Sequence, residues 1–166
     1  MNIIKNNINK VLFGIFTITL LTSCENDGYA DYKTELTPSV ELNGEWYIDI
    51  SNSTGLLYEH THHYTYDSNK GDNTMFFDSK GAGKSLKGLV NVDNKNYTFT
   101  SNASENLLRP VAKFTVTEGK ILKGAAHSRA GNVTDSIYLK VEFSNEPGIT
   151  YTYSGHKRTG FLEDNY

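Results

Sequence analysis

The feature that most constrains the fold is a two-residue alternation of apolar and polar side chains, clearest over residues 133–144, where Asp135 is the one charged residue on the apolar face. One face of this stretch carries its large apolar side chains, which are Val133, Ile137, Leu139, Val141 and Phe143. Successive side chains of a β-strand point to opposite faces of the sheet. The pattern therefore predicts a strand with one buried face.

The same alternation recurs from residue 42 onward, broken at short intervals by Gly, Asn, Asp and Pro, which are typical of turns. Further strands are expected over residues 42–50, 56–67, 74–78, 85–92, 97–101, 111–117, 120–127 and 149–155. Hairpin turns are expected at residues 93–96, 118–119 and 145–148. A 3.6-residue period is not sustained anywhere, and residues 103–108 allow a single helical turn at most.

Eight or nine short strands joined by short links describe a meander, which closes into a barrel or folds into a sandwich. Closure removes both exposed sheet edges, and this favours the barrel for a chain rich in β-branched and aromatic residues. We therefore predict an all-β fold, an up-and-down antiparallel β-barrel of about eight strands, over residues 41–166. A barrel of this size is either filled by side chains or able to hold one small ligand.

The N-terminal segment has the layout of a secretory signal. A basic start with Lys5 and Lys10 precedes an apolar run over residues 11–21, which is too short to span a bilayer as a helix. The run ends in Leu-Thr-Ser followed by Cys24, the only cysteine of the chain. This ending resembles a bacterial lipobox, in which the thiol receives a diacylglycerol and the chain is cut before it. The alternative is a plain secretory signal followed by an unrelated cysteine.

The lipobox resemblance implies a signal peptide over residues 1–23, lipidation at Cys24 and a lipid-anchored place in the cell envelope, at the outer membrane. Residues 24–40 are then the acylated cysteine and a flexible tether, since they are polar and carry Gly28 and Pro38. The formal net charge is −3 and no basic cluster is present, which argues against a nucleic-acid partner. The expected partners are the membrane, through Cys24, and a small lipid-like ligand; no cofactor is expected.

Two longer resemblances concern the ends of the predicted barrel. Gly44-x-Trp46 and Arg158 are similar to the calycin arrangement of lipocalins, in which an arginine packs on the tryptophan. The stretches 43–47 and 154–164, with the lipobox and the acidic tether, resemble a family of Bacteroidota lipoproteins described as "lipid-binding putative hydrolase". This resemblance covers nearly all of the chain after Cys24. It implies a lipocalin-like barrel with a lipid ligand, and it carries over no catalytic residue.

Strand parity predicts which side chains line the barrel. The large aromatic residues expected to face inward are Trp46, Phe99, Phe114, Tyr151 and Tyr153, and Leu122 is expected on the same inner surface. Gly88, Ala112 and Gly124 share these faces and leave volume beside them. Large aromatic residues next to small ones are compatible with a ligand cavity and with ordinary core packing.

The strand expected over residues 56–67 has an unusual polar and aromatic face. Its members are Tyr58, His60, His62, Tyr64 and Tyr66. If this face points inward, it lines a cavity for a ligand with polar groups, and if it points outward, the tyrosines pack along the surface. His60 and His62 also lie on one side of the strand, in a spacing able to chelate zinc or copper, but no third ligand can be assigned, so no metal site is expected.

The sequence lacks the Gly-x-Ser-x-Gly and His-Glu-x-x-His motifs of the common serine and zinc hydrolases. The expected function is therefore a lipid-anchored envelope protein whose barrel binds a lipid or another small apolar or amphipathic ligand. One alternative is a hydrolase acting on a lipid-like substrate, which convergent Ser, His and carboxylate groups would favour. The other is a non-catalytic interaction module of a cell-surface complex, which a filled barrel with an apolar outer patch would favour.

Overall fold

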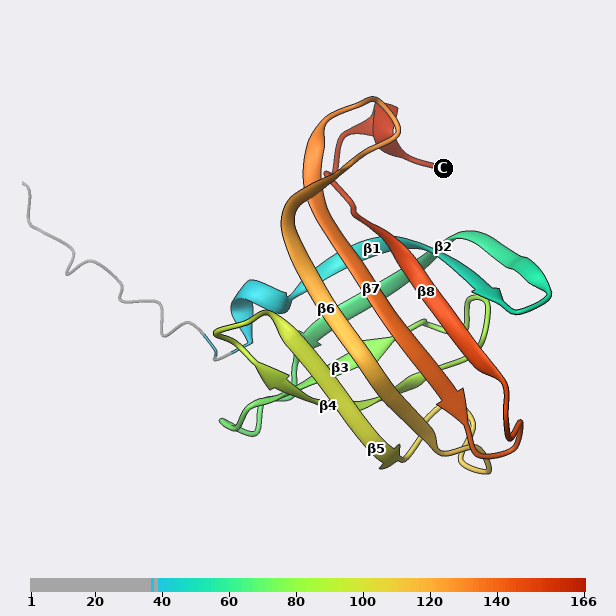
Figure 1. Ribbon diagram of the computed structural model, residues 1–166. Coiled ribbons are helices and arrows are strands. Elements are labelled where there is room, and N and C mark those ends of the chain that lie inside the picture. Colours follow the sequence, from blue (N-terminus) through green and yellow to red (C-terminus); the bar gives the residue numbers. More distant parts are fainter. Residues whose placement is uncertain (1–36, 38) are drawn as a thin grey trace, which may run out of the picture. The chain divides into compact units, whose positions relative to one another are not determined.

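The computed structural model describes residues 37 and 39–166, and within them the fold is all-β (Figure 1). The strands are β1 (Gly44–Asn52), β2 (Gly55–Asp67), β3 (Thr74–Asp78), β4 (Lys87–Asp93), β5 (Thr98–Ser104), β6 (Phe114–His127), β7 (Val133–Phe143) and β8 (Thr150–Lys157). Two 3-10 helices, η1 (Val40–Leu42) and η2 (Leu162–Asp164), flank the strands. In the described part of the chain, no helix has the length and apolar character needed to cross a membrane.

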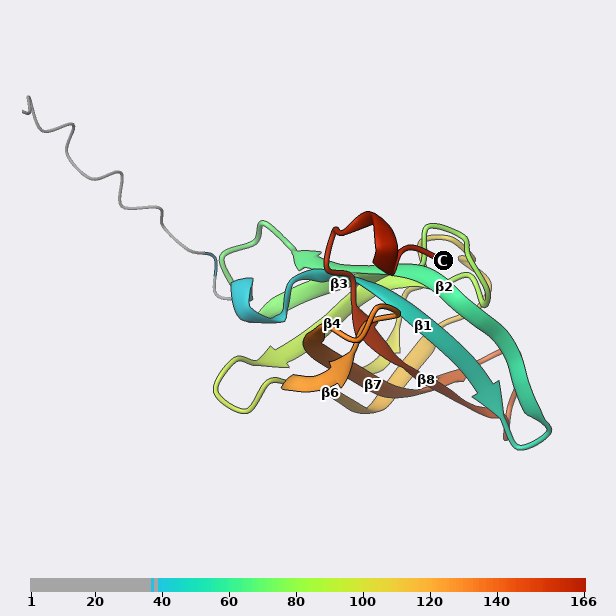
Figure 2. The ribbon, with the colours of Figure 1, turned by 90° about the horizontal axis from the view of Figure 1, so that it is seen from above.

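The strands form a closed barrel in which each pairs antiparallel with the next and β8 returns to β1 (Figure 2). In the closing ladder, Trp46 lies opposite Lys157 and Ile50 lies opposite Tyr153. Closure gives each of the eight described strands a partner on both sides and so reduces the exposed sheet edge. The predicted up-and-down antiparallel barrel of about eight strands is confirmed.

Strand β6 differs from the prediction, because it is one long strand where two strands and a hairpin at residues 118–119 were expected. Its pairing with β7 shifts register between Val116 and Lys120. Gly119 lies here against the ring of Phe99, so closely that no side chain would fit. The irregularity inverts the alternation, and Ile121 is buried while Leu122, which was expected inside, is 48% exposed.

Large side chains fill the barrel interior. The indole N–H of Trp46 donates a hydrogen bond of 2.9 Å to the Thr65 hydroxyl, which in turn donates to the Leu42 carbonyl. Leu42 belongs to η1 and is fully buried, so this short helix is tied to the core at one end of the barrel. Satisfied polar groups of this kind let a barrel end close without orphaned donors.

Arg158 does not pack on Trp46 as the calycin resemblance implied. Its guanidinium donates a hydrogen bond of 2.8 Å to the Glu45 carboxylate, and the cation over the Trp46 ring is Lys157, at 5.8 Å from the ring centre. Lys157 is the residue opposite Trp46 in the closing ladder. Strand pairing therefore brings the lysine to the ring, and the arginine follows one residue later, beside Glu45.

The chain after β8 is fastened to the turn between β6 and β7 through Asp164, which is 1% exposed. Its carboxylate accepts hydrogen bonds from the Thr159 hydroxyl at 2.6 Å, the Ala130 amide at 2.7 Å and the Asn132 side chain at 3.1 Å. These bonds, that of Thr159 first, hold the pKa of Asp164 well below its ordinary value.

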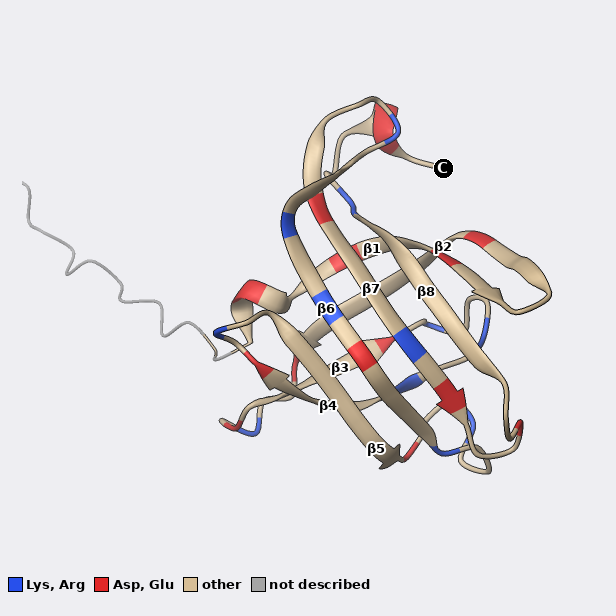
Figure 3. Ribbon diagram, in the orientation of Figure 1, with Lys and Arg blue, Asp and Glu red and all other residues tan. Residues whose placement is uncertain are grey.

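Four loops lie at the same end of the barrel, because antiparallel neighbours return to the same end after every second strand. We call this the loop end; it consists of residues 53–54, 79–86, 105–113 and 144–149. Strands β6 and β7 carry interspersed charged residues of both signs (Figure 3). Some of these form ion pairs, such as Lys140 with Glu118 at 2.8 Å. The predicted signal peptide, Cys24 and nearly all of the predicted tether lie outside the described residues.

Candidate functional site

Five of the residues predicted to line the barrel lie together in its interior. Trp46, Phe99, Phe114, Tyr151 and Tyr153 are each at most 4% exposed and belong to one hydrophobic cluster. They come from β1, β5, β6 and β8. Their burial agrees with the inward direction that strand alternation predicts. The space between them is occupied by their own side chains.

The polar and aromatic face of β2 lies mostly outside the barrel, so the inward alternative is wrong for His62, Tyr64 and Tyr66. His62 is opposite Tyr47 and stacks on it at 5.3 Å, and the hydroxyl of Tyr66 donates to Asp78 at 2.9 Å. Alternation divides a strand into two faces without saying which one is buried, and the register with β1 decides this. That register places His63 opposite Trp46, facing the interior.

A β-bulge changes the parity of β2 at His60, whose φ is +50°. The register shifts here, between Ile48 and Ile50 of β1, and Tyr58 becomes the partner of Ile50. Tyr58 is 41% exposed at the loop end. The ring of His60 is exposed and stacks on Tyr166, with the ring centres 3.8 Å apart. The five residues predicted as one wall are therefore divided by the bulge.

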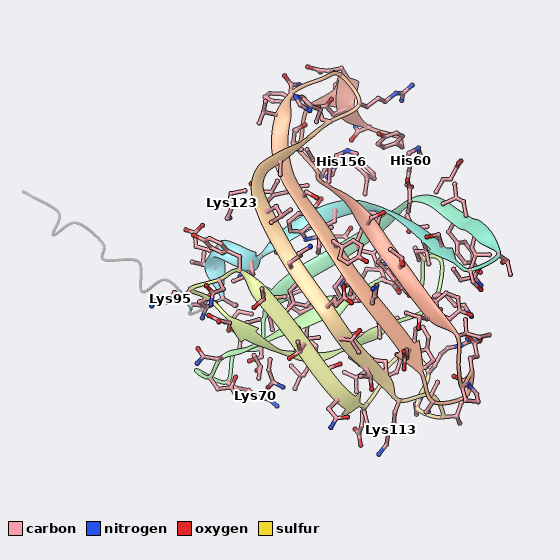
Figure 4. All side chains as sticks on the ribbon, viewed as in Figure 1. His60, Lys70, Lys95, Lys113, Lys123 and His156 are labelled. Carbon is pink, nitrogen blue, oxygen red and sulfur yellow. The ribbon has the colours of Figure 1, made fainter. Side chains whose placement is uncertain are left out.

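The histidines on the outer face of β2 pair with separate carboxylates. His60 lies 3.4 Å from Asp49, and His62 lies 3.3 Å from Glu45. The ring centre of His156 lies 5.8 Å from that of Tyr166 and 5.8 Å from that of Tyr47. His156 and His60 are labelled in Figure 4. Over residues 37 and 39–166, no three His, Cys, Asp or Glu side chains are grouped so as to hold a metal ion. The same residues include no hydrogen bond between a serine hydroxyl and a histidine ring.

The buried polar residue that sequence reasoning missed is His63, which is fully buried on the inner face of β2. Its Nδ1–H donates to the Thr61 carbonyl at 3.0 Å, which leaves Nε2 as a bare acceptor with no partner among the described residues. Burial lowers the pKa of His63 to about 4, so the ring is neutral at physiological pH. His63, Phe77 and Tyr153 pack ring to ring, with centres 5.5 to 6.0 Å apart.

An apolar groove lies on the outside of the barrel, where β4 and β5 diverge. Their ladder covers only residues 91–93 of β4, and beyond it the Leu107 amide donates to the Lys87 carbonyl at 2.7 Å. We call this hollow the β4 groove. It has a volume of about 280 Å³ and is lined by Lys70, Phe76, Gly88, Leu89, Ser104, Glu105 and Leu107. Lys70, labelled in Figure 4, contributes a positive charge to the lining.

Gly88 allows a close approach beside this groove, because an added Cβ would overlap the buried ring of Phe114 and the Glu105 carbonyl oxygen. Phe76 and Leu89 are cross-strand partners on the outer face, and Leu107 is 53% exposed. A second hollow of about 290 Å³, between residues 103, 113–115 and 142–148, has a more polar lining. No sequence pattern predicts either hollow, since strand alternation concerns which side chains face the barrel interior.

A cluster of polar side chains links two loops of the loop end. Lys84 Nζ donates to both oxygens of the Glu146 carboxylate at 2.7 and 2.8 Å, and the hydroxyl of Tyr151 donates to the same carboxylate at 2.6 Å. The bond from Lys84 is the main reason that the pKa of Glu146 is lowered. Arg109 lines the same narrow pocket, which has no room for a water molecule. The cluster joins loop 79–86 to loop 144–149.

The sequence model of a family described as lipid-binding putative hydrolase matches residues 31–162 of the chain. No curated protein shows a significant sequence match to this chain. Since the match covers most of the chain and all eight strands of the barrel, the protein belongs to this family of lipid-binding putative hydrolases.

Proposed function

We propose that the protein is a lipoprotein of the bacterial envelope, lipid-anchored at Cys24, with a lipocalin-like barrel that binds a small apolar or amphipathic ligand. The family description supports a lipid ligand. The observation that carries the proposal is the β4 groove, whose volume of about 280 Å³ is near the lower end of the range for small-molecule sites. The barrel interior is occupied by aromatic side chains, so the groove is where an apolar chain finds open space.

The apolar side chains that line the groove are open to solvent, and a bound ligand would cover them. Phe76 and Leu89 form its wall and Leu107 projects beside them. Each methylene that a ligand buries here contributes about 0.8 kcal/mol. A bound acyl chain of about ten carbons would therefore contribute about 8 kcal/mol before the cost of association.

Leu107→Glu tests the groove with the apolar fluorescent probe N-phenyl-1-naphthylamine. The charge removes an apolar contact and places a carboxylate in the binding space, so we expect at least about tenfold weaker binding, equivalent to 1.4 kcal/mol. Leu122→Glu is the matched control, since Leu122 is similarly exposed on β6 and does not line the groove. It should change the dissociation constant less than about twofold.

Equal weakening by both substitutions would show that the probe does not use the groove. A wild-type protein that binds no apolar probe at all would contradict the ligand-binding proposal. It would favour the second candidate, a non-catalytic interaction module. The filled barrel interior and the exposed side chain of Leu107 are also compatible with that function.

Cys24→Ala tests the anchor. We expect the variant to lose acylation and to move from the membrane fraction to the soluble fraction, because stable anchoring needs two or more acyl chains. The barrel should remain folded, since β1 begins at Gly44, 20 residues after Cys24. Fractionation and mass spectrometry of the mature N-terminus measure the two effects. Membrane retention equal to that of the wild type would contradict the lipoprotein proposal.

A further inference from the structure

The loop end of the barrel, at the right and lower right of Figure 1, exposes a group of large aliphatic side chains. Of the nine large aliphatic side chains that are exposed among the described residues, six lie in or beside its loops: Leu56, Leu57, Leu107, Leu108, Val111 and Ile149. Exposed apolar side chains that gather in one region commonly mark a surface that binds a protein or a membrane.

The loop between β5 and β6 turns its apolar side chains outward and a polar one inward. Asn106 is fully buried, and its side-chain N–H donates to the Ser85 carbonyl at 2.9 Å while its side-chain oxygen accepts from the Leu108 amide at 3.1 Å. Leu107 and Leu108 are 53% and 40% exposed, and Val111 is 88% exposed. This reverses the usual preference of these residue types for the interior and the surface. The exposure of the three apolar side chains is therefore built into the hydrogen bonding of the loop.

The tip of the β1–β2 hairpin exposes apolar side chains on both of its faces. Leu56 and Leu57 are consecutive residues of β2, so their side chains point to opposite faces of the strand. Both are exposed. A strand that is covered on one side would bury one of the two, so the hairpin tip extends beyond the barrel wall.

The loops of this end contact one another and form one surface. An added Cβ at Gly83 would lie 3.5 Å from the ring of Tyr58, which places the β3–β4 loop against the β1–β2 hairpin. Lys84 of the same loop pairs with Glu146 of the β7–β8 loop at 2.7 Å. The exposed apolar side chains therefore belong to loops that are held together.

Basic residues accompany the apolar side chains. The four loops of the loop end contain four basic and two acidic residues, although the whole chain has a formal net charge of −3. Arg109 and Lys113 are exposed, and in the described part of the chain neither has a carboxylate within 4 Å. Lys113 is labelled in Figure 4. Apolar side chains interspersed with basic ones are typical of surfaces that bind anionic membranes.

The other three exposed aliphatic side chains, Leu122, Val133 and Leu162, do not share this setting. Leu122 lies within β6, and Val133 begins β7 at the opposite end of the barrel. Leu162 is followed directly by the exposed Glu163, whose charge opposes contact with an anionic surface. The combination of apolar and basic groups is therefore a property of the loop end.

We propose that the loop end docks on the surface of a bilayer that contains anionic lipid. Leu108 and Val111 enter the boundary between head groups and acyl chains, and Arg109 and Lys113 pair with lipid phosphates. Leu107 also lines the β4 groove, so the groove reaches the docked surface and a lipid passes between bilayer and groove there. This transfer rests on the proposed ligand-binding function, whereas the docking does not.

Sedimentation with vesicles of phosphatidylcholine and phosphatidylglycerol tests the docking, with the Cys24→Ala protein used so that no acyl anchor contributes. Val111→Asp should weaken binding at least about tenfold, because it removes an apolar contact and places a carboxylate against anionic lipid. Val133→Asp is the matched control, since Val133 is 68% exposed at the opposite end, and it should change binding less than about twofold. Without vesicles, Val111→Asp should bind N-phenyl-1-naphthylamine as the wild type does, since Val111 does not line the groove.

Lys113→Gln tests the electrostatic part of the docking. It should weaken binding to these vesicles about fivefold, the effect of one basic residue near an anionic surface, and leave the weaker binding to pure phosphatidylcholine vesicles unchanged. Lys95→Gln is its control, because Lys95 lies in the β4–β5 turn at the opposite end. Ile149→Asp, in a different loop, should act as Val111→Asp does and keeps the test decisive if that variant fails to fold.

Unchanged vesicle binding by Val111→Asp and Ile149→Asp, or equal weakening by Val133→Asp, would overturn the docking surface. Self-association of the Cys24→Ala protein that both loop substitutions abolish, together with no binding to vesicles, would assign the surface to a second copy of the chain and also overturn it. Vesicle binding and probe binding are measured separately, so a failure of the docking is distinguishable from a failure of the proposed function.

Discussion

The free energy of unfolding should fall by about 2–3 kcal/mol more in the wild type than in a His63→Leu variant when the pH is lowered from 7.5 to 4.5. Above pH 6.5 the ring is neutral in both the folded and the unfolded chain. Between pH 6.5 and about 4, the unfolded chain binds a proton that folded His63 does not, because its pKa is lowered to about 4. Stability is therefore lost as the pH falls through this window, and the loss ends near pH 4.

Urea unfolding followed by Trp46 fluorescence at several pH values measures this difference. His127→Gln is the matched control, since His127 is an exposed histidine at the end of β6 and its removal should leave the wild-type slope unchanged. A His63→Leu variant with the same pH slope as the wild type would show that His63 is not buried in a neutral form.

Gly155→Ala should destabilise the protein by about 3 kcal/mol, because it places a methyl group inside the seam that closes the barrel. Gly155 of β8 lies opposite Ile48 of β1. An added Cβ would overlap the Tyr47 carbonyl oxygen and lie 2.9 Å from the Ile48 Cα, and backbone atoms cannot yield as a side chain can. Urea unfolding and thermal melting measure the effect.

Ser154→Ala is the control for the seam, since Ser154 is the exposed neighbour of Gly155 in the same strand. It should change the free energy of unfolding by less than about 0.5 kcal/mol. If Gly155→Ala were as stable as Ser154→Ala, strands β1 and β8 would not approach each other as closely as the closed barrel requires.

The sheet itself could be predicted from local pattern because hydrophobic alternation is a property of each strand alone. Residues 133–144 were predicted as a strand, and β7 covers Val133–Phe143. The inward positions of Trp46, Phe114 and Tyr153 follow from the same rule. The rule fails in β6, because Gly119, which resembled a turn residue, lies within the strand, and the register shift beside it inverts the alternation.

The candidate site could be predicted less well, since it depends on contacts between segments far apart in the chain. The β4 groove needs Phe76 and Leu89 beside Leu107, and the loop-end cluster joins Lys84 to Glu146. A lysine and a glutamate 62 residues apart have no sequence pattern that pairs them. His63 could not be singled out from the sequence, because alternation does not say which face of β2 is buried and the register with β1 decides it.

The sequence by itself determined that this chain forms a barrel of alternating strands. The buried face of each strand is visible in its own alternation, and a series of such strands is favoured to close because closure removes free sheet edges. Only the tertiary structure decided which face of β2 is buried, where the bulge at His60 falls and which loops meet at the loop end. These follow from the register between strands. Register is fixed by the packing of whole side chains across the barrel, so that His63, and not His62, lies beside Phe77 and Tyr153.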